Sequence, residues 1–182
     1  MIVAGAKQRD RQAADAQEVS PFDLSRLSGR LGVGFVSITG EASMRALAAC
    51  AEGSVELMYC GGLLHRLARA DGERLLATCF RVLKPCGSLR VTTIDLDQVV
   101  HGYLFDWAGT DDTGPSRTDR LNAAFRDGGA QFVYGEEELT ALLARTGFAD
   151  IRRFGVGASA DERFWNLESD QAQALILEAV KP

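Results

Sequence analysis

Two side chains that can transfer a proton stand directly after predicted strands. His65 lies on the turn that follows a predicted strand at 55–60, and Asp95 follows a predicted strand at 88–94. Histidine has an ordinary pKa close to neutral pH, and a carboxylate also accepts a proton, so either residue could be a general base. In an open α/β sheet the carboxyl ends of the strands form the edge where ligands bind. The pattern therefore places two candidate catalytic residues at one edge.

Each of these residues also has a purely structural interpretation. A histidine at a helix start beside Arg66 can be a solvated surface residue, and an aspartate before a helix is a common N-cap. His101 and Tyr134 are further candidates at the same edge, although residues at such positions more often pack or face solvent. The sequence leaves these alternatives open.

Glycines at two turns could let a ligand approach the backbone. Gly61 and Gly62 follow the strand at 55–60, and near the start an apolar run at 1–4 leads into Gly5. In a doubly wound domain such an opening run is the central strand, and its glycine lies in the turn beneath a cofactor. We therefore expect both turns at the same edge of the sheet.

The elements that would position these residues form a strand, helix and strand unit. Apolar residues alternate through 55–60 and again through 88–94, as in half-buried strands. Between them, the stretch from Asp71 carries a helical apolar stripe that ends at Pro85 and Gly87. A strand, a helical crossover and a second strand favour a parallel sheet with right-handed connections.

Further elements extend this unit in both directions. The pattern predicts additional strands at 12–19, 31–38, 151–156 and 174–180. It predicts additional helices at 40–51, 96–107, 117–127 and 136–147. The last two strands would form a hairpin in which the final strand is antiparallel to the rest. The chain is therefore expected to be a single Rossmann-like α/β domain, 1–182, with a doubly wound, mostly parallel sheet of about seven strands and helices on both faces.

Composition and charge narrow the class of protein. The 182 residues are 46% hydrophobic and 25% charged, as in an ordinary globular protein. The formal net charge of −5 gives no electrostatic footprint for nucleic acid or an anionic membrane. The four cysteines form no Cys-x-x-Cys pair, so we expect reduced thiols and no metal site. The start of the chain becomes charged too early for a signal peptide, which predicts a cytoplasmic protein.

Several of these stretches also carry a likeness to a known family. They read GSVELMYCGGLLHRL, then FRVLKPCGSLRV, then TIDLDQVV, followed by DRLNAAFRDGGAQFVYGEEELTALLARTGFADIRR and ALILEAVKP. This succession resembles the second half of class I S-adenosylmethionine-dependent methyltransferases, of the type 11-like group. The resemblance covers about the last two thirds of the chain.

The resemblance implies S-adenosylmethionine as the cofactor and methyl transfer to a small-molecule or sugar-like acceptor. It implies that the turns at the strand ends hold the cofactor. The matching positions in this chain are Ala4, Gly5, Ala6, Asp15, Ser37, Cys60, Gly61 and Gly62. Asp15 would meet the ribose hydroxyls, and Ser37 stands where the family commonly has an aspartate that touches adenine.

The chain also departs from the family pattern. The glycine-rich loop is reduced to Gly5, the adenine-contacting aspartate is replaced by Ser37, and the histidine and glutamate after the fourth strand become Gly62 and His65. Cys86 takes the place of the first glycine in a Pro-Gly-Gly turn, and its simplest interpretation is a structural turn residue. Each lost hydrogen bond to a charged group removes about 1.5–3 kcal/mol, so cofactor binding could be weak or lost.

Three functions are compatible with these residues. The first is a methyltransferase with a divergent cofactor site, in which His65 or Asp95 helps an acceptor lose its proton. The second is a catalytically inactive relative that serves as an interaction or accessory subunit, with a protein partner or as a homodimer. The third is a relative recruited to a cyclisation or isomerisation, with His65 or Asp95 as the acid or base.

Overall fold

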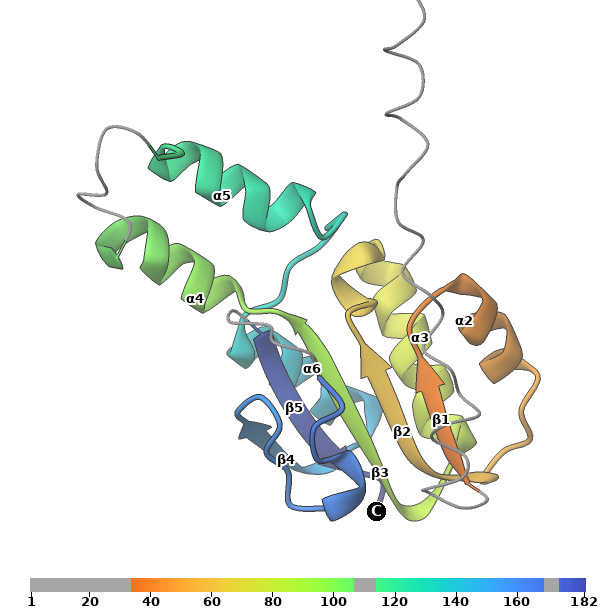
Figure 1. Cartoon of the computed structure of the whole chain (residues 1–182). Helices are drawn as coiled ribbons and strands as arrows, with labels where there is room; N and C mark the ends of the chain where they lie inside the picture. Colours follow the sequence, from red (N-terminus) through yellow and green to blue (C-terminus); the bar gives the residue numbers. More distant parts are fainter. Residues whose placement is uncertain (1–33, 107–113, 169–173) are drawn as a thin grey trace, which may run out of the picture.

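The computed structural model describes residues 34–106, 114–168 and 174–182, which form one mixed sheet with helices packed on it (Figure 1). Within these residues the sheet has five strands, in the order β1-β2-β3-β5-β4. The strands are β1 (Phe35–Ile38), β2 (Val55–Gly61), β3 (Leu83–Ile94), β4 (Ala149–Phe154) and β5 (Ala174–Val180). The strands beyond these that the sequence predicted, at 1–4 and 12–19, lie outside the described residues.

The strand directions agree with the sequence prediction. β1, β2 and β3 run parallel, whereas β5 is antiparallel to both of its neighbours, β3 and β4. The final strand is therefore antiparallel to the rest of the sheet, as expected. β3 begins at Leu83 instead of residue 88, because its register shifts against β2 between Val55 and Leu57 and the Lys-Pro-Cys-Gly stretch stays within the strand.

The expectation of a central opening strand is wrong. The place beside β2 is taken by β1, paired from Phe35 with Leu57 through Ile38 with Cys60. β2, β3 and β5 each have a described strand on both sides, so the middle of the sheet has no open position. The reason is local: β1 and β2 are joined by one short helix, and consecutive elements of this kind usually lie side by side.

One face of the sheet is covered by helices. These are α2 (Glu41–Ala48), α3 (Arg69–Val82) and α6 (Glu136–Thr146), and α3 contacts both of the others (Figure 1). Every second residue of the strands points into this layer, as with Met58 and Cys60 in β2 and Leu89 and Val91 in β3. The hydrophobic core therefore lies between the sheet and these helices.

The opposite face differs from the expectation of helices on both faces. Among the described residues it is covered by the segment 155–168, which contains only the short 3₁₀ turn η3 (Glu162–Phe164). The strands present polar side chains there, in a row that pairs Tyr59 with Arg90 and Arg90 with Glu178. Polar groups on a covered face must find partners, since each unpaired one costs free energy.

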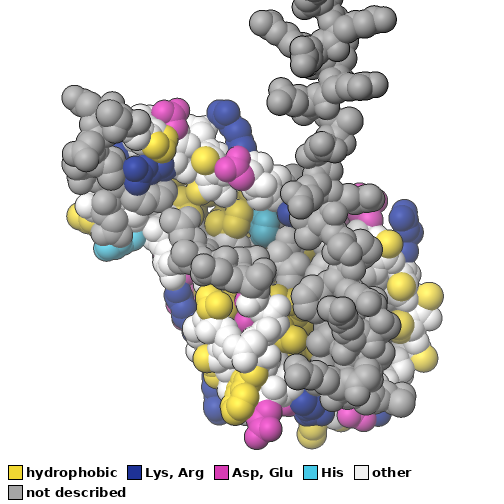
Figure 2. All heavy atoms as spheres, viewed as in Figure 1, with side chains coloured by type: hydrophobic (Ala, Val, Ile, Leu, Met, Phe, Trp, Pro, Cys, Tyr) yellow, Lys and Arg dark blue, Asp and Glu magenta, His cyan; other side chains and the backbone are white. Residues whose placement is uncertain are grey.

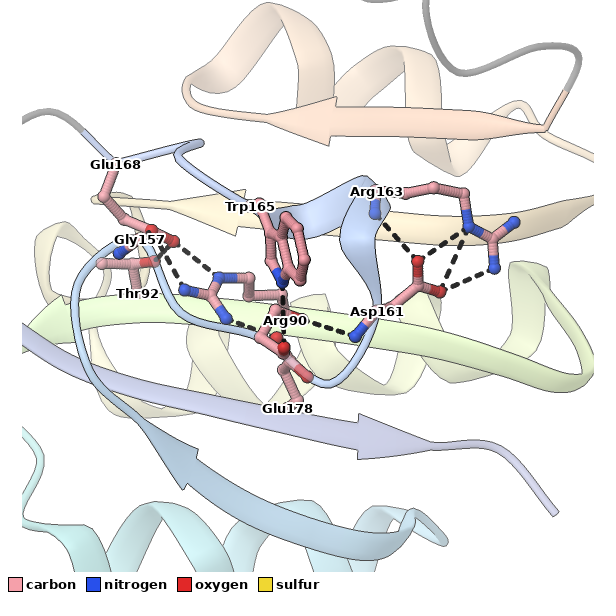
Figure 3. Close-up of polar contacts among 9 residues, drawn as sticks. Arg90, Thr92, Gly157, Asp161, Arg163, Trp165, Glu168 and Glu178 are labelled. Atoms are coloured by element: carbon pink, nitrogen blue, oxygen red, sulfur yellow. Dashed lines mark hydrogen bonds and ion pairs between the residues drawn. The ribbon is translucent and has the colours of Figure 1, made fainter.

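Arg90 is the centre of those partnerships (Figure 3). It is completely buried, and its Nε and Nη2 atoms donate to the two carboxylate oxygens of Glu168 at 2.6 and 3.0 Å. Its Nη1 atom donates to Glu178 on β5, and the Gly157 N–H and the Thr92 hydroxyl also donate to Glu168. We call Arg90, Glu168 and Glu178 the Arg90 cluster. It ties β3, β5 and the segment 155–168 together.

Two helices extend beyond the carboxyl end of β3. α4 (Leu96–His101) continues as a π-helical turn, η2 (Gly102–Asp106), and α5 (Arg117–Arg126) lies alongside (Figure 1). The Ser116 and Asp119 side chains form a capping box at the start of α5. No helix in the described parts of the chain has the length and apolar character needed to cross a membrane.

Candidate active site

A pocket of about 300 Å³ opens at the carboxyl ends of β2 and β3, beneath α5. Figure 2 shows this hollow between α5 and the end of the sheet, with hydrophobic side chains and a histidine on its wall. Its lining consists of Gly62, His65, Arg66, Thr93, Ile94, Ala124 and Gly128. The edge at which the sequence predicted a site therefore carries a pocket.

The turn after β2 brings His65 to the wall of this pocket. Gly62 has a φ of 61°, a left-handed conformation that glycine adopts without steric cost, and its N–H donates to the Thr92 carbonyl at 2.9 Å. The chain then forms a single 3₁₀ turn, η1 (Leu64–Arg66), anchored by the buried side chain of Leu64. His65 is thus positioned by a short, well-packed turn.

Both the ring and the backbone of His65 are held. Its side chain is 6% exposed, and its Nδ1 lies 3.3 Å from the hydroxyl oxygen of Thr93 on β3. Its carbonyl accepts from the N–H groups of Gln131 and Phe132, at 2.7 and 3.2 Å. The loop after α5 is therefore joined to the turn after β2, and the imidazole cannot swing freely.

The surroundings of His65 keep the ring neutral. Burial lowers its pKa from the ordinary 6.5, and the positive charge of Arg66 lowers it further, whereas the Gly128 carbonyl opposes both effects. A neutral imidazole carries a basic nitrogen. Gly128 also leaves space at the other ring nitrogen, because a Cβ there would lie only 3.2 Å from Nε2.

Asp95 has the structural role. It is fully buried, and its Oδ1 accepts from the N–H of Gln98 at 3.1 Å, which caps α4. Its Oδ2 accepts from Nη2 of Arg153 at 2.6 Å. Both oxygens are occupied and Asp95 does not line the pocket, so these contacts favour capping over proton transfer.

His101 and Tyr134 also lie away from the pocket lining. His101 is exposed on α4, with its ring 5.0 Å from that of Phe105. Tyr134 is completely buried in the core against Phe132, and its hydroxyl has no hydrogen-bond partner within the described residues. Both positions fit the structural interpretation that the sequence left open.

No protein-family model and no curated protein matches the sequence. Among solved structures, an S-adenosylmethionine-dependent methyltransferase from Archaeoglobus fulgidus matches with a TM-score of 0.51 and 12% identity, over 78% of this chain and 66% of that one. The chain has the class I methyltransferase fold. The match supports neither the type 11 group specifically nor a particular activity.

Two further matches have the same character. A putative O-methyltransferase from Nostoc punctiforme matches with a TM-score of 0.45 and 15% identity, over 74% of this chain and 33% of that one. Human N-acetylserotonin methyltransferase, solved with S-adenosylmethionine, matches with a TM-score of 0.44 and 20% identity, over 74% of this chain and 32% of that one. The chain spans about a third of the length of these two structures.

The methyltransferase resemblance assigned several residues to the cofactor, and those that the structure describes do not lie together. Gly62 lines the pocket, but a Cβ on Gly61 would lie 2.5 Å from the Tyr59 ring, so this glycine makes room for a side chain. Cys60 points into the core, and burial raises the pKa of its thiol to about 12. Ser37 lies on the opposite face, level with Tyr59. The others, Ala4, Gly5, Ala6 and Asp15, lie outside the described residues.

A second glycine turn nevertheless stands beside Gly62. Ile38 pairs with Cys60, so the turns that follow β1 and β2 are neighbours at one edge. No described residue lies within 4 Å of the Cβ position of either Gly40 or Gly62, so a ligand can approach both backbones closely. Two open glycine turns at adjacent strand ends fit a nucleoside cofactor such as S-adenosylmethionine.

Three residues of this site were missed by the sequence reasoning. Thr93 belongs to the predicted strand, but its contact with His65 depends on how β2 and β3 align. Gly128 follows the helix predicted at 117–127 and was not a candidate, and Arg66 was considered only as a neighbour of His65. The single available signal was the alternation of β3, which puts Thr93 on the same face as Val91.

Proposed function

We propose that this protein is a methyltransferase whose pocket at the ends of β2 and β3 receives the hydroxyl group of a small-molecule acceptor, with His65 as the general base. The observation that carries the proposal is the neutral, buried imidazole of His65, hydrogen-bonded to Thr93 on the wall of a pocket. The methyltransferase fold supports the reaction class.

The chemistry of methyl transfer decides which part the cofactor supplies and which part the protein supplies. S-adenosylmethionine, when bound, supplies an activated methyl group, so the protein has mainly to align the acceptor and exclude water. Gly40 and Gly62 would hold the cofactor at the neighbouring strand ends. The acceptor hydroxyl would then lie in the pocket next to His65, where its proton must be removed.

His65 can take that proton at Nε2. With an acceptor bound, the ring would keep its proton on Nδ1 and donate it to the Thr93 hydroxyl oxygen. Its Nε2 lone pair would then accept from the acceptor hydroxyl in place of the contact with the Gly128 carbonyl. After accepting the proton, the ring is a cation close to Arg66. The same burial and charge that lower its pKa then favour release of the proton to solvent.

A non-catalytic relative is the second candidate. The observation in its favour is that Ser37 and Cys60 face away from the edge where the cofactor would bind. Such a protein would keep the fold and the pocket without binding S-adenosylmethionine.

Calorimetry separates the two candidates. We expect S-adenosylmethionine and S-adenosylhomocysteine to bind with a dissociation constant tighter than about 100 μM, which is about −5.5 kcal/mol. Absence of binding by both would favour the non-catalytic relative.

Variants then test the base. His65→Gln should lower the rate of methyl transfer to hydroxyl acceptors by about a hundredfold or more, with cofactor affinity unchanged. His101→Gln is the matched control, since His101 is exposed on α4 and outside the pocket lining, and it should keep full activity. Equal rates for both variants would exclude His65 as the base.

A further inference from the structure

We propose that the acceptor carries a carboxylate, which Arg66 binds at the pocket while His65 faces the hydroxyl group. This inference rests on the proposed function and names its substrate class: a small hydroxy acid. Two separate observations on the described residues support it: Arg66 forms no ion pair with any of them, and none of those that line the pocket is acidic.

Arg66 is held in place without being neutralised. Its Nε donates to the Gly128 carbonyl at 3.0 Å, which fixes the guanidinium at the pocket lining. No ion pair with Arg66 occurs within the part of the chain that the structure describes. Five other arginines there pair with carboxylates, namely Arg69, Arg74, Arg90, Arg153 and Arg163, whereas Arg66 belongs to those that do not. Arg66 therefore keeps further N–H donors for a ligand, out of the five that an arginine carries.

The pocket offers that cation no competing anion. Among the described residues that line it, none carries a carboxylate, although the chain as a whole has a formal net charge of −5. The remaining lining is neutral or apolar. A planar carboxylate can accept two parallel hydrogen bonds from a guanidinium, so it is the ligand group that complements this site best.

Size and spacing restrict the ligand further. His65 and Arg66 both line the same pocket, so the two groups that they contact must fit within it on one ligand. The volume of about 300 Å³ is at the lower end of the range for small-molecule pockets. A single ring bearing both a hydroxyl and a carboxyl group meets these limits.

A bound carboxylate would also change His65. The charge of Arg66 lowers the pKa of the imidazole, so neutralising that charge would raise this pKa and make Nε2 a stronger base. The ligand would thereby strengthen the base that acts on it. This effect gives a readout that does not depend on activity.

The test uses 3-hydroxybenzoate and its neutral analogue 3-hydroxybenzamide as probes, with binding followed by calorimetry and by histidine NMR. We expect the wild type to bind the acid about tenfold or more tightly than the amide, because the bonds to Arg66 are charge-assisted. Binding of the acid should raise the pKa of His65. Arg66→Gln should remove both effects, and Arg66→Lys should keep part of the preference.

Arg145→Gln is the matched control, since it removes the same charge from an exposed position on α6, and it should behave as the wild type. Equal affinity for acid and amide in the wild type, or an Arg66→Gln variant that keeps the preference, would overturn the inference. Failure of both probes to bind the wild type would also overturn it.

A carboxylate could also come from the amino-acid part of S-adenosylmethionine, so the effect of Arg66→Gln on S-adenosylhomocysteine binding is measured in parallel. Weaker cofactor binding with an unchanged preference for the acid would assign Arg66 to the cofactor and overturn the inference. The proposed function fails separately: if neither cofactor binds but the acid still binds through Arg66, the pocket assignment stands and methyl transfer does not.

Discussion

Arg90 and Arg66 are the same side chain in opposite settings. Arg90 is completely buried and bonded to two carboxylates, whereas Arg66 is exposed and, among the described residues, makes one side-chain hydrogen bond, to a backbone carbonyl. Burial alone would lower the pKa of Arg90, but Glu168 and Glu178 outweigh it and raise that pKa. An arginine that is paired with buried carboxylates holds the fold together. An arginine that is anchored but has no ion pair among the described residues is available to a ligand.

The largest effect should come from breaking the Arg90 cluster. Arg90→Met removes one partner of a buried ion pair and leaves two carboxylates without a cation, so the free energy of unfolding should fall by about 3–5 kcal/mol. Urea denaturation measures the change. Arg66→Met is the matched variant and should stay within about 0.5 kcal/mol of the wild type.

Equal losses of unfolding free energy in these two variants would show that Arg90 and Arg66 do not differ in their structural roles. If Arg90→Met does not fold, Glu168→Gln is measured in its place. That substitution keeps the shape of the side chain and should still destabilise the protein by clearly more than Arg66→Met.

The next effect concerns the space beside Nε2 of His65. A Cβ on Gly128 would lie 3.0 Å from Ile94 Cδ1 and 3.2 Å from His65 Nε2, so Gly128→Ala should weaken probe binding by about tenfold while the protein stays folded. Gly129→Ala, at the adjacent residue, is the control. Its φ of 64° makes a side chain costly by about 1 kcal/mol, but its Cβ would meet no atom of the described chain within 4 Å.

These two variants should therefore separate binding from stability. Gly128→Ala is expected to lose affinity, and Gly129→Ala is expected to lose stability with affinity preserved. A Gly128→Ala protein that binds the probes as well as the wild type does would show that the pocket lies elsewhere.

The pH dependence of stability just below neutral pH should follow His65. The folded-state pKa of His65 is lowered, so the folded state resists protonation of this ring. Burial of the neutral ring contributes fully to the free energy of unfolding above the unfolded-state pKa of about 6.5. This contribution is lost as the pH falls through the folded-state pKa. Wild type should therefore lose stability relative to His65→Gln on acidification below about pH 6.5.

Unfolding curves of the wild type and of His65→Gln from pH 7.5 to 5 measure this difference. A His65→Gln protein whose stability stays parallel to that of the wild type over this range would contradict the burial of a neutral ring.

The smallest effect should come from two buried tyrosines. The Tyr59 hydroxyl is hydrogen-bonded to Thr92, next to the Arg90 cluster, so Tyr59→Phe should cost about 0.5–1.5 kcal/mol. The Tyr134 hydroxyl has no partner within the described residues, so Tyr134→Phe should be neutral or slightly stabilising. Thermal unfolding compares them, and a larger loss for Tyr134→Phe would reverse the expectation.

Local patterns predicted much of the fold. The alternation around 55–60, the helical stripe after Asp71 and the final antiparallel strand are all confirmed. Gly147 ends α6 with a φ of 112°, as its position in the sequence suggested. These features depend on neighbours within one turn or one strand, so the local sequence is enough to predict them.

Features that depend on distant contacts were not predictable in the same way. Arg90 alternates with buried residues and would be expected to face solvent, but Glu168, 78 positions later, covers it. Gly128 is anchored to Arg66 from 62 positions away. The place of β1 beside β2 likewise depends on which strands pair, and not on the local sequence of β1. His65 was predicted at the edge because its turn is local, while its partner Thr93 needed the sheet register.

Histidine NMR tests the central claim most directly. The chain has only two histidines, so a sample labelled with ¹⁵N-histidine gives a spectrum that a His101→Gln variant assigns. We expect His65 to titrate below the ordinary value of 6.5, because its ring is buried beside Arg66. A His65 ring that titrates above 6.5 would contradict this expectation.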